Sequence, residues 1–296
     1  MKRLVVIGLS LFSTPATAAE PAWMPRSWTL DTAVATSQGV YGDSQLRRRS
    51  SHYGLHLSWR YLEQGGLDVL YGRSRIDFKR RIASSIQDEW TLSGRIQRFS
   101  DTFGGRFPLR LDGHRIDSND SDDVTAVGGL TAFTNYARTR YADLGYVASR
   151  YGSANTDQWV DQFTVTAGAG RAAYWFQARG YLIRPAESLR PQSGHDWLQA
   201  VELKGFRYSQ TSGAGKPSLV WIGIVAGERQ YTVDPDAYAV YNLADLQTAL
   251  LEGGLQWTPS ETLRLDLIGG GGQYHNHALD DQYQHYYLYV ALNHRW

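Results

Sequence analysis

A carboxylate and an imidazole stand two residues apart at Asp112 and His114, a spacing that could support hydrolysis. Side chains alternate between the two faces of an extended strand, so residues two apart share a face. An imidazole beside a carboxylate can take a proton from a water molecule and thereby activate it. Asp112 and His114 are therefore candidate catalytic residues, but a polar pair on a wetted surface is the interpretation that we favour.

A second group of histidines and carboxylates lies near the C-terminus, in the stretch QYHNHALDD. His275 and His277 would share one strand face, which suits two ligands of a divalent metal. The acidic run from Asp117 to Asp123 could in turn hold calcium through carboxylate oxygens. The histidine spacing matches no specific metal signature, and acidic runs are common in solvated loops, so no metal and no other cofactor is expected.

The N-terminus carries a segment that we do not expect in the folded protein. Two basic residues precede an apolar run from Leu4 to Phe12, and Ala16-Thr17-Ala18 follows as an A-x-A cleavage site. This pattern is typical of a secretory signal peptide, and the apolar run is too short to span a bilayer as a helix. We expect residues 1–18 to be removed on export and residues 19–296 to form a single domain.

The composition excludes several classes of protein. The formal net charge is +1, and loss of two basic residues with the signal peptide leaves no electrostatic footprint for nucleic acid. There is no cysteine, so disulfides cannot stabilise the exported chain. The 19 Tyr and 10 Trp residues are of the types that favour membrane–water interfaces.

Apolar and polar residues alternate along most of the chain, which is the period of strands with a different solvent on each face. The C-terminal strand is an example, because one of its faces carries Tyr286, Leu288, Val290, Leu292, His294 and Trp296. Strands are predicted at 27–38, 51–62, 66–78, 87–99, 103–115, 124–136, 140–150, 157–168, 171–184, 196–209, 217–230, 246–257, 261–274 and 283–296. Twelve strands would also fit, and a short helical piece is expected within Ala237–Leu251.

The predicted links between these strands alternate in length. Odd-numbered links such as GVYGDSQLRRRS are longer, and the eleventh, QYTVDPDAYAVYNLAD, is the longest. Even-numbered links such as LEQGG and TPSE are shorter, with QTSGAGKPS as an exception. Alternation of this kind indicates a barrel with loops at one end and tight turns at the other. An even number of strands places both termini at the turn end.

With its signal peptide, alternating strands, aromatic strand ends and terminal Trp296, the chain resembles the outer-membrane β-barrel proteins of Gram-negative bacteria, a porin-like class. The resemblance implies an all-β fold, a closed antiparallel transmembrane β-barrel of about 14 strands with both termini periplasmic. It also implies that Trp296 is the membrane-insertion signal read by the barrel-assembly machinery. A periplasmic β-sandwich or lipocalin-like barrel is the weaker alternative, because so many inward apolar strands would overfill its core.

The charged residues predicted to line the lumen are of both signs. They are Arg60, Arg95, Arg106, Arg110, Arg179, Glu202, Lys204, Glu252, Arg264 and Asp266. Balanced charge favours cross-strand ion pairs and weak ion selectivity. Fourteen strands lie between a filled eight-strand barrel and an open channel of 16–18 strands. The sequence therefore favours a narrow channel for small polar solutes, while a lumen whose ion pairs serve folding alone explains the charges equally well.

Two other functions remain open. One is an accessory outer-membrane barrel for export or anchoring of a surface polysaccharide. The other is an outer-membrane hydrolase, since Asp112-Gly113-His114 resembles the Asp-x-His element of omptin-type outer-membrane proteases. Those proteases have ten strands and a facing pair of acids, whereas Asp234 and Asp236 here lie in a Pro-containing loop. We therefore prefer a channel without enzymatic activity.

The expected partners follow from this location in the cell outer membrane. They are outer-membrane lipid and lipopolysaccharide, the barrel-assembly machinery and small polar solutes, with no nucleic acid. The basic stretches Arg47–Arg49 and Lys79–Arg81 could contact lipopolysaccharide phosphates through paired hydrogen bonds. Solubilising loops would show the same composition.

Overall fold

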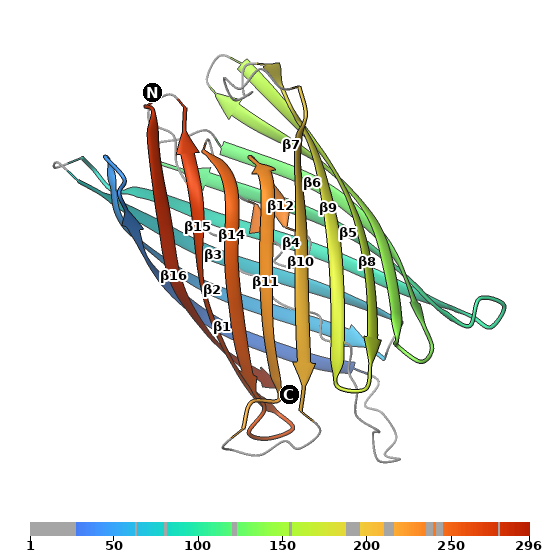
Figure 1. Cartoon of the computed structure of the whole chain (residues 1–296). Helices are drawn as coiled ribbons and strands as arrows, with labels where there is room; N and C mark the ends of the chain where they lie inside the picture. Colours follow the sequence, from blue (N-terminus) through green and yellow to red (C-terminus); the bar gives the residue numbers. More distant parts are fainter. Residues whose placement is uncertain are drawn as a thin grey trace.

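The computed structural model describes residues 28–62, 64–79, 82–119, 123–153, 156–187, 196–209, 216–234, 239–240, 245–277 and 279–296. They form a closed antiparallel barrel of fourteen strands and a separate two-stranded sheet (Figure 1). The barrel fold and its strand count of fourteen are thus confirmed. The predicted signal peptide, residues 1–18, lies outside the described residues.

The barrel strands follow the chain in order. They are β1 (Trp28–Gly42), β2 (Arg47–Tyr61), β3 (Gly65–Phe78), β4 (Ser85–Ser100), β5 (Gly105–Ser118), β6 (Asp123–Asn135), β7 (Arg140–Ser153), β8 (Thr156–Arg171), β9 (Tyr174–Pro185), β10 (Leu198–Tyr208), β11 (Leu219–Arg229), β14 (Leu246–Trp257), β15 (Leu263–Asn276) and β16 (Asp281–Arg295). The small sheet pairs β12 (Val233–Asp234) with β13 (Ala239–Val240), both in the link between β11 and β14.

The first and last strands close the barrel. β1 pairs with β16 in a continuous antiparallel register in which Val34 lies opposite Leu292. The backbone N–H of Trp296 extends this pairing by donating to the carbonyl of Leu30 at 2.9 Å. Both ends of the described chain therefore lie at the end of the barrel that carries the tight turns. Closure pairs every barrel strand on both sides, which removes the sheet edges.

Most strands extend further toward the loop end than their composition predicted. The first link was expected to be long and charged, but β1 continues to Gly42 and β2 begins at Arg47. β14 begins at Leu246, as predicted. A short helical piece was expected within Ala237–Leu251, where the described residues 239–240 and 246–251 are strand, and residues 237, 238 and 241–244 lie outside the described residues. The first link is shorter than expected for a physical reason. Ladder hydrogen bonds to two neighbouring strands extend a strand through residues whose composition is typical of loops.

The faces of the sheet are inverted relative to a water-soluble protein. The middle of the outward face carries exposed aliphatic residues such as Leu92, Leu111 and Leu144. Exposed aromatic residues flank this band, at the loop end with Tyr53, Trp90, Tyr146, Phe163 and Tyr286, and at the turn end with Trp28, Trp59, Tyr61, Tyr174 and Trp296. The inner face is polar. An apolar band between two aromatic girdles is the surface of a transmembrane β-barrel.

Within the described part of the chain, no helix is long and apolar enough to span a membrane.

The outward apolar band predicts that a charged substitution lowers the stability of the barrel by an amount that depends on its depth in the bilayer. Leu111→Arg lies halfway along β5, and we expect it to lower the free energy of unfolding by about 2–4 kcal/mol because an arginine at the bilayer midplane is poorly solvated. Denaturant unfolding in phospholipid vesicles measures this difference. The control is Gln273→Arg near the loop end of β15, where we expect a loss of about 0–1 kcal/mol. Equal losses at both positions would contradict the placement of the band.

Candidate functional site

The link between β11 and β14 folds into the barrel. In Figure 1 its short strands β12 and β13 lie inside the ring of long strands. Tyr231 and Val233 are buried in an apolar cluster on the inner wall together with Tyr151, Val160 and Tyr181. The rings of Tyr151 and Tyr231 meet edge to face with centroids 4.7 Å apart. Burial of apolar surface therefore draws this link, called the inward segment below, away from the loop end.

Hydrogen bonds fix the inward segment to the strands behind it. The side-chain amide of Gln162 on β8 donates to the carbonyl of Val233 at 2.6 Å and accepts from the N–H of Val233 at 2.9 Å. The hydroxyl of Tyr151 on β7 donates to the carbonyl of Tyr231 at 3.3 Å. One glutamine thus pairs both backbone groups of a residue, as a neighbouring strand would.

The other end of the inward segment is held by Asp245, which is fully buried. Its carboxylate accepts hydrogen bonds from the hydroxyl of Tyr283 and the amide of Asn276, both at 2.5 Å, and pairs with the guanidinium of Arg47 at 2.6 Å. Arg47 is only 2% exposed and lies within the barrel wall. The expected contact of Arg47 with lipopolysaccharide is therefore wrong, because Arg47 neutralises a buried acid instead.

A group of five ionisable side chains lies where the inward segment meets β9, β10 and β14. This charged cluster consists of Arg179, Glu202, Lys204, Asp234 and Glu252, all buried. Lys204 Nζ lies 2.7 Å from Glu202 and 3.8 Å from Glu252. Arg179 Nη1 lies 3.4 Å from Glu202 and 3.8 Å from Asp234. Two cations and three acids are thus held together, and Asp234 ties the inward segment into the cluster.

Tyrosine hydroxyls complete the hydrogen bonding of the acids. Tyr181 donates to Glu202 at 3.1 Å and Tyr287 donates to Glu252 at 2.7 Å. The ring of Tyr287 lies flat over Gly270 on the neighbouring strand, where an added β-carbon would be 2.8 Å from the ring. Glycine at this position lets a long side chain lie along the wall instead of crossing the lumen.

An arginine-rich wall faces the charged cluster. Arg60, Gly66, Arg95 and Arg110 are successive cross-strand partners on β2, β3, β4 and β5. Six strands lie between β5 and β14 in either direction around the ring, so Arg110 on β5 stands across the lumen from the strand of Glu252. Arg106 lies on the same face of β5, nearer the turn end.

Among the described residues, the arginines of this wall pair with three acids, and the first is Asp31 on β1, whose carboxylate lies 3.9 Å from Nε of Arg60. Asp68 is fully buried and pairs with Arg95 at 2.6 Å, with His56 at 3.1 Å and with Arg60 at 3.8 Å. Arg110 pairs with Asp112 at 2.9 Å. Between the two walls, on β15, Arg264 and Asp266 pair with each other at 3.1 Å.

The candidate catalytic residues engage different partners. Asp112 accepts from Nε of Arg110 at 2.9 Å, and Nδ1 of His114 bonds the hydroxyl of Thr91 at 2.8 Å. Asp234 lies in the charged cluster beside Arg179. In the described part of the chain, the hydrogen bond of His114 thus goes to a hydroxyl, while the nearby carboxylate of Asp112 is held by Arg110.

The candidate metal ligands lie at the loop end of β15. The rings of His275 and His277 have centroids 4.0 Å apart, and His275 Nε2 lies 3.5 Å from the exposed carboxylate of Asp280. Partial burial and the neighbouring imidazole of His275 lower the pKa of His277. Within the described ranges, no group of three or more His, Cys, Asp or Glu residues is arranged to hold a metal ion.

Several residues of the site were not predicted from the sequence. Asp234 and Asp245 lie in a long link that was expected to be an external loop, and Arg229 stacks over Tyr181 with 5.0 Å between the guanidinium carbon and the ring centroid. The one signal in the sequence was the length of the eleventh link, together with its Tyr and Val residues. Apolar side chains in a long link indicate that the link packs against something.

Comparison with known proteins shows only distant likenesses. No protein-family model and no curated protein sequence matches the chain. Similar solved structures include the outer membrane protein OprD from Pseudomonas aeruginosa, with 7% identity, coverage of 98% of both chains and a TM-score of 0.42. Pseudomonas aeruginosa OpdK with vanillate has 11% identity, coverage of 91% of this chain and 99% of that chain, and a TM-score of 0.42.

Salmonella typhi OmpF in complex with daunomycin has 10% identity, coverage of 91% of this chain and 97% of that chain, and a TM-score of 0.43. Likenesses of this size carry no conclusion about activity. The function proposed below therefore rests on the residues of this chain.

The buried pair that holds the inward segment predicts a large stability effect. Arg47→Met leaves the Asp245 carboxylate buried without its counter-ion, and we expect a loss of about 3–5 kcal/mol in the free energy of unfolding. Denaturant titration in detergent micelles measures the loss. Adding Asp245→Leu to Arg47→Met removes the stranded charge, so the double variant should regain part of the stability. A double variant less stable than Arg47→Met would contradict this account.

Proposed function

We propose that the protein is a narrow channel of the Gram-negative outer membrane through which small polar solutes diffuse. The observation that carries this proposal is the inner face of the barrel, which is polar and charged and is narrowed by the inward segment. In the proposed channel, polar side chains of the inner face replace water around the solute as it passes the apolar band.

The two charged walls suggest how solutes are sorted. Acids outnumber cations in the charged cluster, and arginines outnumber acids on the opposite wall. A dipolar solute can align in the field between such walls, whereas a simple ion of either sign meets both attraction and repulsion. The channel should therefore pass small polar solutes with weak overall preference between cations and anions.

Single-channel recording tests the proposal. Purified protein in planar phospholipid bilayers should give steady conductance steps, with a cation-to-anion permeability ratio near one. Absence of any conductance from a correctly folded barrel would overturn the proposal and would favour an accessory role in export or anchoring of a surface polymer.

Removal of one charge from each wall should shift selectivity in opposite directions. Glu252→Gln keeps the acceptor for Tyr287 but removes an anion, and Arg110→Gln removes a cation from the facing wall. We expect the cation-to-anion ratio to fall with Glu252→Gln and rise with Arg110→Gln. The change should be on the order of fivefold, because a unit charge about 4 Å from an ion in water is worth about 1 kcal/mol.

Reversal potentials in a salt gradient measure both shifts. As a control, Arg98→Gln alters an outward-facing arginine of β4 and should leave the ratio unchanged. Shifts of the same sign for Glu252→Gln and Arg110→Gln would contradict opposed charges on the two walls.

The orientation and assembly of the barrel complete the proposal. The turn end with both termini is assigned to the periplasm, and the loops to the exterior. Trp296 is proposed as the insertion signal read by the barrel-assembly machinery. Its exposed ring lies at the turn end, with Nε1 donating to the hydroxyl of Thr32 at 3.2 Å and His294 packed 4.3 Å from it. Contact with lipopolysaccharide is proposed for exposed Arg49, which pairs with Asp77.

Deletion of Trp296 separates assembly from stability. The residue lies at the end of the ladder, so we expect the truncated barrel to refold in detergent with little loss of stability. In cells, we expect its amount in the outer membrane to fall several-fold, because recognition and not folding is impaired. Quantitative immunoblots of outer-membrane fractions measure the amount. Trp28→Ala, at the same girdle on β1, serves as the control and should assemble normally.

A further inference from the structure

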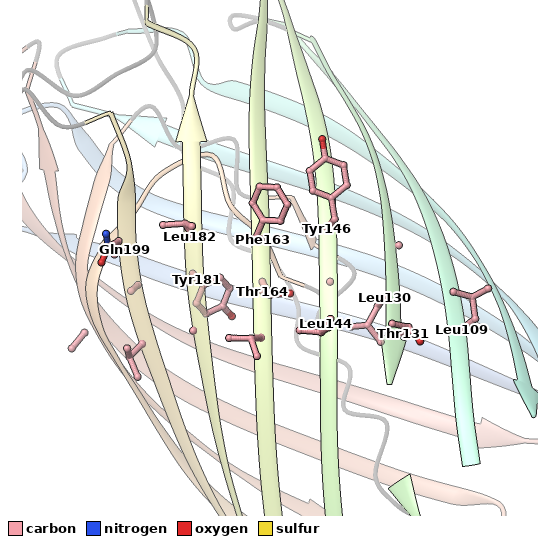
Figure 2. A pocket seen from close by; sticks show the side chains of 17 residues that line it. Leu109, Leu130, Thr131, Leu144, Tyr146, Phe163, Thr164, Tyr181, Leu182 and Gln199 are labelled. Carbon is pink, nitrogen blue, oxygen red and sulfur yellow. The ribbon is translucent and has the colours of Figure 1, made fainter. Parts of the chain in front are cut away.

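An apolar groove of about 880 Å³ lies on the outward face of the barrel, over strands β5 to β11. Its sides include Leu109, Leu144, Phe163 and Leu182 (Figure 2). Gly180 contributes to its floor, because a glycine on an outward position leaves a depression where other residues fill the surface. The groove is therefore a feature of the membrane-facing surface, separate from the lumen.

The loop end of the groove carries aromatic and polar groups. The rings of Tyr146 and Phe163, side by side in Figure 2, have centroids 4.9 Å apart. The hydroxyl of Tyr146 donates to the carboxylate of Asp161 at 2.7 Å. Gln199 also lies at this end, on the other side of Leu182. The apolar groove thus ends, at the level of the aromatic girdle, in groups that can form hydrogen bonds.

Two exposed arginines stand beyond these groups on the same outward face. Arg184 is the cross-strand partner of Asp161, and its guanidinium carbon lies 5.6 Å from the ring centre of Trp197. Arg150 is the cross-strand partner of Trp159, a residue that is 54% exposed. Arg150 and Arg184 thus present guanidinium groups at this end of the groove, with the carboxylates of Asp161, Glu187 and Asp196 on the same or adjoining segments.

We propose that the groove binds an acyl chain of lipopolysaccharide and that Arg150 and Arg184 bind its phosphates. The inference rests on the proposed outer-membrane function, since the loop end then faces the leaflet that contains this lipid. Guanidinium groups bind phosphate oxygens through paired hydrogen bonds, and tryptophan rings favour the depth at which headgroups and chains meet. From the turn end to the loop end, the apolar groove, the aromatic girdle and the arginines follow one another. The acyl chain, the junction of chain and headgroup, and the phosphates of the lipid lie in the same order.

Charge complementarity favours this lipid over a second copy of the chain. Two barrels in one membrane share their orientation, so a two-fold contact through the groove would bring Arg184 toward its own symmetry mate. Like charges at such a contact are unfavourable unless an anion lies between them. An anionic lipid satisfies the same arginines without that cost.

Lipid retention by purified barrels tests the proposal. The probe is rough lipopolysaccharide, added to the detergent-solubilised full barrel and counted by native mass spectrometry. Gly180→Leu fills the groove, and space is available because an added β-carbon would lie 3.4 Å from Val165 Cγ1, an ordinary contact. Gly94→Leu is the matched control on the outward face of β4, where a β-carbon has no neighbour within 4 Å.

The arginines are tested separately from the groove. We expect Arg184→Gln with Arg150→Gln to weaken lipopolysaccharide binding at least about tenfold, which is the effect of losing one charge-assisted hydrogen bond. Arg98→Gln, an exposed outward arginine near the turn end, should bind like the unaltered protein. Lipopolysaccharide stripped of its phosphates should bind the unaltered protein as weakly as intact lipid binds the double variant.

The outcomes are distinct. Reduced binding by Gly180→Leu and by the double arginine variant, with both controls unchanged, supports the proposal. Unchanged lipid binding by either test variant overturns it, and so does a loss of oligomer mass by Gly180→Leu with lipid retained, which would identify a second copy as the occupant. Conductance in phospholipid bilayers without lipopolysaccharide is measured on the same variants, so failure of the channel function is seen independently.

Discussion

Closure of the sheet between β1 and β16 is the constraint on which the rest of this structure depends. Hydrocarbon offers no hydrogen-bond partner to a backbone amide, so a spanning sheet is tolerated only when every strand is paired on both sides. The register from Asp31–Arg295 to Gly42–Gln284 meets that requirement along the whole seam. Closure also explains why strands persist through polar stretches such as Arg47–Ser51, where a soluble protein would form a loop. Once a neighbouring strand is present on each side, continuing the ladder of backbone hydrogen bonds is more favourable in free energy than leaving those groups unpaired.

Closure imposes an inside as well as an outside. With lipid on one face, polar side chains collect in the interior, where they must satisfy one another. The result is visible at Asp68, which is fully buried among Arg60, Arg95 and His56, and at Asp245, which collects Arg47, Tyr283 and Asn276. Pairs of this kind add little net stability relative to apolar residues, but loss of one partner is costly. They therefore specify where the inward segment sits more than they hold the barrel together.

Glycine has a different role on each face. On the inner face, Gly270 and Gly66 have no β-carbon in the space that a neighbouring side chain occupies. Tyr287 lies over Gly270 and Arg95 lies over Gly66. On the outer face, Gly180 leaves part of the groove that continues toward Arg184. On the inner face, the missing β-carbon of a glycine thus lets a neighbouring side chain lie against the wall and not across the lumen. On the outer face, it leaves a recess in the surface.

The sequence by itself determined the class of fold and predicted about fourteen strands, with twelve left open, because the period of two and the aromatic strand ends are local properties of a membrane-spanning barrel. The same period predicts which residues share a face, and so Arg179, Glu202, Lys204 and Glu252 could be named as a set. It could not show that they form one cluster with Asp234, since this contact joins β9 to a link more than fifty residues later in the chain. Only the tertiary structure decided three other features. They are the inward position of that link, the burial of Arg47 against Asp245, and the groove at Gly180. Each depends on cross-barrel packing, whose partners come together only after the sheet has closed.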